Sequence, residues 1–152
     1  MTEFSVRPWM NHSPPTIDPK ENLRRALAKL RLDGVQELLV VDNGKLVGSL
    51  NEQDIWSHCP TGTLLLEEQQ ANELLEQFRV GGIMTLHPPM ITPEASLREA
   101  IQLFAQTKRH ALPVVENGAL VGVLTEERAL QVAAAVLGEV EQCTAKKASE
   151  EK

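Results

Sequence analysis

The chain has 152 residues, enough for one ordinary domain or two small ones and too few for a large multidomain enzyme. Hydrophobic residues make up 42% and charged residues 24%, proportions that argue against intrinsic disorder and fibrous proteins. Aromatic residues reach only 3% and the formal charge is -6, which disfavours stacking platforms for nucleic acid and broad binding of a polyanion.

The two cysteines and the N-terminus bear on location. Cys59 and Cys143 lie far apart and show neither a CxxC pair nor Cys/His ligand spacing. Two such thiols favour a reducing compartment over a disulfide framework or a zinc site. The N-terminus lacks an apolar signal core, and no stretch approaches about 18 uninterrupted apolar residues. We therefore expect a soluble cytoplasmic protein without a membrane span.

The sequence repeats itself at an offset of 74 residues. Residues 6–55 align with residues 80–129 without a gap, and 19 of the 50 aligned positions are identical. The densest match pairs residues 38–50 with residues 112–124. Chance does not place so many matches in one register, so the chain is two copies of one supersecondary unit.

Each copy begins with the same predicted elements. Short segments between prolines at residues 16–17 and 90–91 fit brief strands. A helix should follow, because apolar residues recur at helical spacing. Asn22 is its cap in the first copy, and Ser96 opens a capping-box pattern with Glu99 in the second.

The second half of each copy predicts a hairpin and another helix. Asn-Gly at residues 43–44 and 117–118 lies between apolar runs, the strongest short-range signal for a tight hairpin turn. Asn51 or Thr125 then caps a second helix. The unit is therefore β-α-β-β-α.

These elements predict an α/β (α+β) fold with two repeats packed in pseudo-twofold symmetry, because a unit of about 50 residues buries too little surface alone. Between the repeats, apolar residues such as Leu74 and Leu75 at helical spacing predict an amphipathic connecting helix. The apolar face of the last helix continues to Val140, and the polar end is expected to fray. The expected division is a first repeat, a helical linker, a second repeat and a flexible tail, at residues 6–59, 60–79, 80–140 and 141–152.

This unit resembles the cystathionine-β-synthase (CBS) motif, and the tandem pair resembles a Bateman module. The resemblance rests on Met84-Thr85, on Ala111-Leu-Pro-Val-Val115 and on Leu120-Val-Gly-Val-Leu-Thr125, and it covers most of the chain. Through Glu73-Leu-Leu75 and residues 78–84, the connecting segment is also similar to CBS proteins labelled acetoin-utilisation protein B-like.

The resemblance implies a stand-alone regulatory module that holds an adenosine compound in the cleft between the repeats. AMP, ADP, ATP or S-adenosylmethionine would be a regulatory ligand and not a catalytic cofactor. The module would form a homodimer through its helical faces and signal to a regulated protein that the sequence does not name. In the family, the Asp of a Thr/Ser-x-x-Asp segment binds the ribose hydroxyls, and the hydroxyl residue contacts phosphate.

Each repeat departs from that pattern at one position. The first has Asn51-Glu-Gln-Asp54, which keeps the carboxylate and loses the hydroxyl. The second has Thr125-Glu-Glu-Arg128, which keeps the hydroxyl and puts an arginine, which has no acceptor, in place of the carboxylate. The second site, at Thr125 and Arg128, is therefore predicted to be degenerate.

Charge before the apolar run of the second repeat favours the first site. Lys108-Arg109-His110 would attract a phosphate, whereas the counterpart, residues 34–36 followed by Glu37, would not. We predict one working site, with Thr16 and Ile17 framing the base. Its residues are Asp54, Asn51, Thr16, Ile17, Lys108, Arg109 and His110.

The same residues have structural interpretations. Asp54 could complement the dipole of its helix, and residues 108–110 could be a solvated helix end. Arg128 could pair with a nearby carboxylate. Trp9 and Trp56 stand beside the repeat boundaries, where they favour docking of the linker or of a partner chain.

Catalysis is disfavoured. The sequence shows no nucleophile elbow, phosphate loop, metal-ligand series or Ser/His/Asp arrangement, and His12, His58 and His87 have no ligand spacing. The alternative to a nucleotide sensor is a ligand-free module for dimerisation or protein interaction, in which both sites have decayed.

Overall fold

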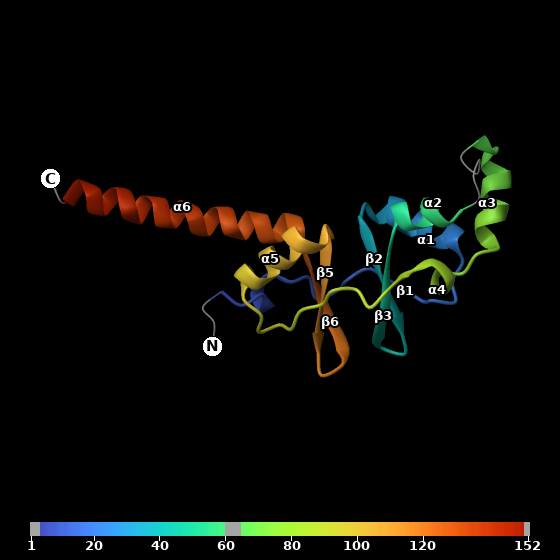
Figure 1. Ribbon diagram of the computed structural model, residues 1–152, viewed down its shortest axis with the longest axis horizontal. Helices are drawn as coiled ribbons and strands as arrows, with labels where there is room; N and C mark the ends of the chain where they lie inside the picture. Colours follow the sequence, from blue (N-terminus) through green and yellow to red (C-terminus); the bar gives the residue numbers. More distant parts are fainter. Residues whose placement is uncertain (1–3, 60–64, 151–152) are drawn as a thin grey trace.

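The structure, a computed structural model, describes residues 4–59 and 65–150 (Figure 1). Its mixed helices and strands confirm the predicted fold class. The first half contains η1 (Arg7–Trp9), β1 (Thr16–Ile17), α1 (Leu23–Asp33), β2 (Glu37–Asp42), β3 (Lys45–Asn51) and α2 (Glu52–His58). The second half contains α3 (Glu68–Glu76), α4 (Val80–Ile83), β4 (Thr85–Leu86), α5 (Leu97–Thr107), β5 (Ala111–Glu116), β6 (Ala119–Thr125) and α6 (Glu126–Glu150).

The two repeats form two sheets with equivalent strand arrangements. The first sheet has the order β1-β2-β3-β4, with β1 parallel to β2 and the other pairs antiparallel. The second sheet has the antiparallel hairpin β5-β6. Single bridges flank this hairpin in the same sense, since Ile91 pairs in parallel with Val114 and Asn11 pairs antiparallel with Val123.

The segment that opens each repeat joins the sheet of the other repeat. β4, which opens the second repeat, pairs with β3 of the first, and Asn11 pairs with β6. Val6 N–H donates to Ala95 O at 3.0 Å, and the pseudo-symmetric bond runs from Val80 N–H to Glu21 O at 2.8 Å. This exchange ties the two repeats into one folding unit.

Two glycines allow the exchanged segments to approach the sheets. A Cβ on Gly48 would lie 2.7 Å from Met84 Sδ, and one on Gly122 would lie 2.7 Å from Asn11 O. Real Cβ atoms do not approach that closely, so Leu-Val-Gly recurs in both repeats because the third position must lack a side chain.

The predicted turns and caps are confirmed. Asn43 and Asn117 have φ of 52° and 53°, and the glycine after each also has positive φ, as the tight hairpin turn requires. Asn22 Oδ1 accepts from Arg25 N–H at 2.9 Å, and Ser96 Oγ accepts from Glu99 N–H at 3.1 Å. These bonds satisfy N–H groups at the starts of α1 and α5 that have no partner within the helix.

Each sheet is covered on one face by helices, and each layer pair encloses its own core (Figure 1). The first core includes Val80 and Ile83 of α4, although these residues belong in sequence to the second repeat. The second core includes Val6 and Met10 for the same reason. The hydrophobic contribution to stability therefore also depends on the exchange.

Helix α6 extends beyond the body of the molecule (Figure 1). It continues past Val140 to Glu150, whereas the sequence analysis ends the apolar face at Val140. Alanine, lysine and glutamate have high helix propensity, so the polar end can remain helical without a core to cover. Within the described residues, no helix is long and apolar enough to cross a membrane.

Candidate functional site

A cavity of about 480 Å³ lies between the two repeats. Its walls come from the loop before β2, from the end of β6 and from the start of α6, and we call it the Thr125 cleft. The lining residues are Asn11, Pro15, Gly34, Val35, Gln36, Glu37, Leu39, His110, Ala111, Val123, Thr125, Glu126, Glu127 and Leu130.

The internal repeat relates this cavity to a pseudo-symmetric position, which is defined by that correspondence alone and which we call the Asn51 cleft. A shift of 74 residues converts Thr125 into Asn51, and it converts residues 34–36 into residues 108–110. Thr125 and residues 34–36 line one cavity, so the pseudo-twofold symmetry places their counterparts, Asn51 and residues 108–110, around one position. Pro15 also lines the Thr125 cleft, so its counterpart Pro89 is expected at the Asn51 cleft, whereas Thr16 and Ile17 are not.

An ion pair joins the two repeats beside the Asn51 cleft. Arg109 Nη1 donates to Glu37 Oε1 at 2.9 Å. The side chain of Glu37 is 3% exposed and that of Arg109 is 18% exposed. Glu37 faces Asn51 in the β2-β3 register, so a cation from the second repeat lies beside the predicted site of the first.

Burial sets the electrostatics of Glu37. Loss of solvent raises the pKa of this carboxyl above its ordinary value, and the charge of Asp54 raises it further. Arg109 and the nearby Ser49 hydroxyl act in the opposite direction and do not offset the burial. Ser49 Oγ is itself buried and makes no hydrogen bond of normal geometry with the described residues.

Asn51 and Asp54 form a reciprocal capping box at the start of α2. Asn51 Oδ1 accepts from Asp54 N–H at 2.8 Å, and Asp54 Oδ2 accepts from Asn51 N–H at 3.0 Å. Both predicted ligand residues therefore also stabilise the helix, and one oxygen of each side chain is already bonded.

The three basic-turn residues have different environments. Lys108 caps the C-terminus of α5 with φ 55°, in the left-handed region. Arg109 binds Glu37, whereas His110 lies in the Thr125 cleft with its Nδ1 3.3 Å from Glu126 Oε2. The cluster is thus divided between the two clefts.

The site predicted to be degenerate, at Thr125 and Arg128, has a helix cap and no ion pair among the described residues. Thr125 Oγ1 accepts from Arg128 N–H at 3.2 Å and caps α6. The expected pairing of Arg128 with a carboxylate is wrong, because its guanidinium lies over the ring of Trp9, 5.5 Å from the centroid, and forms no ion pair within residues 4–59 and 65–150. Cation–π contact replaces the expected Coulombic contact.

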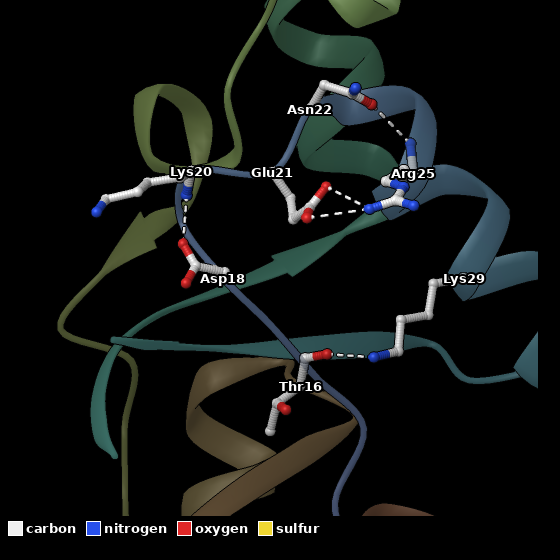
Figure 2. A network of polar contacts seen from close by, with 7 residues as sticks. All are labelled: Thr16, Asp18, Lys20, Glu21, Asn22, Arg25 and Lys29. Atoms are coloured by element: carbon white, nitrogen blue, oxygen red, sulfur yellow. Dashed lines mark hydrogen bonds and ion pairs between the residues drawn. The ribbon is translucent and has the colours of Figure 1, made fainter. Parts of the chain in front are cut away.

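Thr16 and Ile17 line a different cavity, of about 710 Å³, along β1 and α1. Figure 2 shows the polar contacts around it: Lys29 Nζ donates to Thr16 O, and Arg25 pairs with Glu21 at 3.2 Å. Asp54 and Asn51 do not line this cavity. The structure therefore brings Asn51, Asp54 and Arg109 together around Glu37 and leaves Thr16 and Ile17 elsewhere.

The central position of Glu37 was not predicted from the sequence. A signal was present, because Glu37 directly precedes a fully apolar strand run while its counterpart in the second repeat is Ala111. A charge at the edge of a buried run needs a partner, and the lysine or arginine closest to the pseudo-symmetric position is Arg109. Within the described residues, no cluster of His, Cys, Asp and Glu is placed to hold a metal ion.

Residues 5–55 and 80–135 match the CBS domain family. The chain belongs to this family. The two matches correspond to the two repeats, so the protein is a CBS pair, as predicted from the sequence.

Two curated relatives of this CBS pair differ greatly in length from each other. The inosine-5'-monophosphate dehydrogenase of Korarchaeum cryptofilum (strain OPF8) is 31% identical over 111 residues, which cover 72% of this chain and 20% of that protein. The CBS domain-containing protein YhcV of Bacillus subtilis (strain 168) is 28% identical over 120 residues, 79% of each chain. The chain thus spans a small part of the dehydrogenase and most of YhcV.

Solved structures of CBS pairs superpose on most of the chain. CBSX2 from Arabidopsis thaliana has a TM-score of 0.77 at 27% identity and covers 89% of this chain and 97% of its own. CBSX2 in complex with AMP has a TM-score of 0.72 at 26% identity, with 88% and 98% covered. A Vibrio cholerae protein named for acetoin utilization (AcuB) has a TM-score of 0.73 at 22% identity, with 93% and 98% covered, and bears on the fold alone.

Proposed function

We propose that this CBS pair is a regulatory module that binds an adenosine nucleotide in the Asn51 cleft and reports its occupancy to a partner protein. Asp54 would accept from the ribose hydroxyls, and Lys108 and Arg109 would contact phosphate. The protein would act by binding and not by catalysis. Support from a relative comes from CBSX2, a CBS pair whose structure contains AMP.

The observation that carries this proposal is the position of Arg109. Its side chain crosses from the second repeat to Glu37, which faces Asn51 across the β2-β3 ladder. Only Nη1 of the guanidinium is bonded to Glu37, so its other N–H donors can bind a phosphate oxygen. Arginine can therefore bridge the buried carboxylate and an incoming phosphate.

The capping box sets a condition on ribose binding. Asp54 Oδ2 accepts from the backbone of Asn51, so Oδ1 must accept the ribose hydroxyls without breaking the cap. A carboxylate has enough lone pairs for both tasks, since two oxygens offer about four acceptor sites. The α2 N-terminus also favours a nearby negative charge.

The test is thermal unfolding with a panel of AMP, ADP, ATP, adenosine and S-adenosylmethionine. A ligand at about 100 times its dissociation constant stabilises the fold by about 2.7 kcal/mol, or roughly 5 to 10 °C for a chain of this size. We expect at least one nucleotide to raise the melting temperature, and Asp54→Ala to remove that rise.

The matched control is Arg128→Ala, at the pseudo-symmetric position. It removes the cation–π contact with Trp9 and leaves the Asn51 cleft intact, so the ligand-induced rise should persist above its own baseline. A panel without any shift at millimolar concentration would contradict the proposal, as would equal loss in both variants.

A ligand-free interaction module is the second candidate. It is favoured by one observation, because the predicted ligand groups are already engaged: Asp54 in its cap and Arg109 with Glu37. Both functions are compatible with a homodimer formed through the helical faces, which light scattering would reject by returning a mass near 16.8 kDa at micromolar concentration. Cytoplasmic residence stays a prediction from the two unpaired thiols.

A further inference from the structure

The outer surface of the second repeat carries an apolar groove between α5 and α6, with a volume of about 410 Å³. We call it the α5–α6 groove. It lies away from both inter-repeat clefts, and none of its residues belongs to the Thr125 cleft. Its lining residues are Phe4, Ser96, Leu97, Arg98, Ile101, Gln102, Ala133 and Leu137.

The first repeat has a corresponding position on α1, and there a helix occupies it. A shift of 74 residues converts Phe4, Leu97 and Arg98 into Phe78, Leu23 and Arg24. At that position α3 packs against α1, at the end of the molecule opposite α6 (Figure 1). Leu75 of α3 is 1% exposed and belongs to the first core.

An ion pair fixes α3 at that position. Arg24 Nη1 bonds to Glu76 Oε1, and Glu76 directly follows the buried Leu75. The occupant of that position is thus an acidic amphipathic helix with two contacts: a leucine that enters the core and a glutamate that pairs with arginine. Its sequence over residues 68–76 contains three glutamates and no basic residue.

The α5–α6 groove keeps Phe4, Leu97 and Arg98 as counterparts of the groups around α3, without an occupant among the described residues. Phe4 is 45% exposed and Leu137 is 61% exposed, whereas Phe78 is half-buried against the first core. The side chain of Arg98, the counterpart of Arg24, makes no ion pair or hydrogen bond within the part of the chain that the structure describes. An apolar floor beside a cation without a partner has the chemistry that α3 satisfies in the first repeat.

We propose that the α5–α6 groove is a docking site for an acidic amphipathic helix of a partner protein, bound as α3 is bound in the first repeat. The helix places a leucine against Leu97 and Ile101 and a glutamate, one residue later, on Arg98. The internal repeat supplies the template, and the charge of Arg98 selects an acidic helix over a basic one.

The experiment uses α3 itself as the probe and attaches it covalently, because a helix of nine residues is marginal as a free peptide. In a graft variant of the full chain, residues 66–77 are copied directly in front of Phe4 in place of residues 1–3. The copy then has the spacing from Phe4 that α3 has from Phe78. A short attachment gives the helix a high effective concentration at the groove.

We expect the graft to raise the melting temperature by roughly 3 °C or more. An increase of about 1 kcal/mol in the free energy of unfolding shifts the melting temperature by a few degrees at this chain length. A matched graft with aspartate at the copied Leu75 position should lose the rise. Arg98→Ala should lower the melting temperature more in the graft background than in the native background.

A graft that leaves the melt unchanged, or a rise that persists with aspartate in the copied helix, overturns the proposal. A second measurement addresses occupation by another copy of this chain. Leu137→Glu should leave the mass in solution unchanged, and conversion of a dimer to a monomer by that substitution would assign the groove to self-association and overturn the proposal. None of these readouts depends on nucleotide binding.

Discussion

Arg109 and Glu37 form an ion pair that joins the two repeats beside the Thr125 cleft. Glu37 lines the Thr125 cleft, whereas Arg109 belongs to the pseudo-symmetric Asn51 cleft, and the two are joined at 2.9 Å. A phosphate bound to Arg109 would weaken the ion pair between Arg109 and Glu37. The carboxylate of Glu37, which lines the other cleft, would then lose part of its charge compensation. If both clefts bind ligands, we expect the two sites to be electrostatically coupled through this ion pair.

Glu37→Gln should change the pH dependence of stability. The pKa of Glu37 is raised in the folded state, so the folded protein binds more protons than the unfolded chain in the window above the ordinary pKa. Stability from this group is fully present below about pH 4 and is lost as the pH rises through the folded pKa. Denaturant unfolding of both proteins from about pH 4 to 7 should show the variant gaining on the native chain as the pH rises.

Glu52→Gln is the matched control for that series. The pKa of Glu52 is lowered, first by the hydrogen bond from Arg31 and then by that from Trp56, so the sign is opposite. Glu52 contributes stability that is present at neutral pH and is lost as the pH falls through its folded pKa. A difference between Glu37→Gln and the native chain that stayed constant with pH would contradict the assignment of a raised pKa.

Lys108→Gly should stabilise the protein. Lys108 has φ 55°, and its counterpart Gly34 has φ 63°, so both repeats need a left-handed residue at the end of the first helix. A side chain at this left-handed position costs about 1 to 2 kcal/mol, which glycine would relieve. Glycine loses more backbone entropy on folding, so the net gain in stability is about 0.5 to 1 kcal/mol. Thermal unfolding should show a small rise for Lys108→Gly and a fall for Gly34→Ala, which has open space around Cβ and suffers only the backbone strain.

The same variant examines whether the lysine is retained for ligand binding. If Lys108 contacts phosphate, Lys108→Gly should reduce the thermal shift given by AMP and leave the shift given by adenosine unchanged. A stabilised variant with undiminished AMP binding would leave the strained lysine without a function in the Asn51 cleft.

The sequence predicted the local structure because local rules decide it. The Asn-Gly turns, the caps at Asn22 and Ser96, and the repeat itself depend on residues close together in the chain. The exchange of opening segments was not predictable in this way. It joins Val6 to Ala95 through a backbone bond that carries no side-chain signature.

The missed parts of the site follow from the missed exchange. Trp9 comes near α6 only because residues 4–11 pack on the second repeat. Arg128 and Trp9 are 119 positions apart in the sequence, so their stacking was not predictable from it. The placement of Thr16 and Ile17 beside Asp54 took the contacts to the base from the same repeat as the ribose carboxylate. In the structure the Thr125 cleft is lined by Pro15 and Leu39 of the opposite repeat.

Gly122→Ala should destabilise the protein strongly. The new Cβ would lie 2.7 Å from Asn11 O and 3.1 Å from Met10 Sδ, so the exchanged N-terminal segment would have to move. Overpacking of this kind costs about 1 to 3 kcal/mol. Gly82→Ala is the matched control, because nothing lies within 4 Å of its Cβ and its backbone is helical. Equal melting temperatures for the two variants would contradict the tight packing of the exchanged segment.

Arg128→Asp should create a second ligand site. The substitution completes Thr125-x-x-Asp and places a carboxylate where the first repeat has Asp54, at the cost of about 0.5 to 1 kcal/mol for the lost contact with Trp9. Because Glu37, Glu126 and Glu127 line this cleft and no Lys or Arg does, it should accept uncharged adenosine more readily than AMP. Calorimetric titration with adenosine should therefore give a stoichiometry near two in Arg128→Asp and near one in the native chain. Arg128→Asn, which also loses the cation but gains no carboxylate, should remain near one, and a native stoichiometry of two would show that the Thr125 cleft never needed the aspartate.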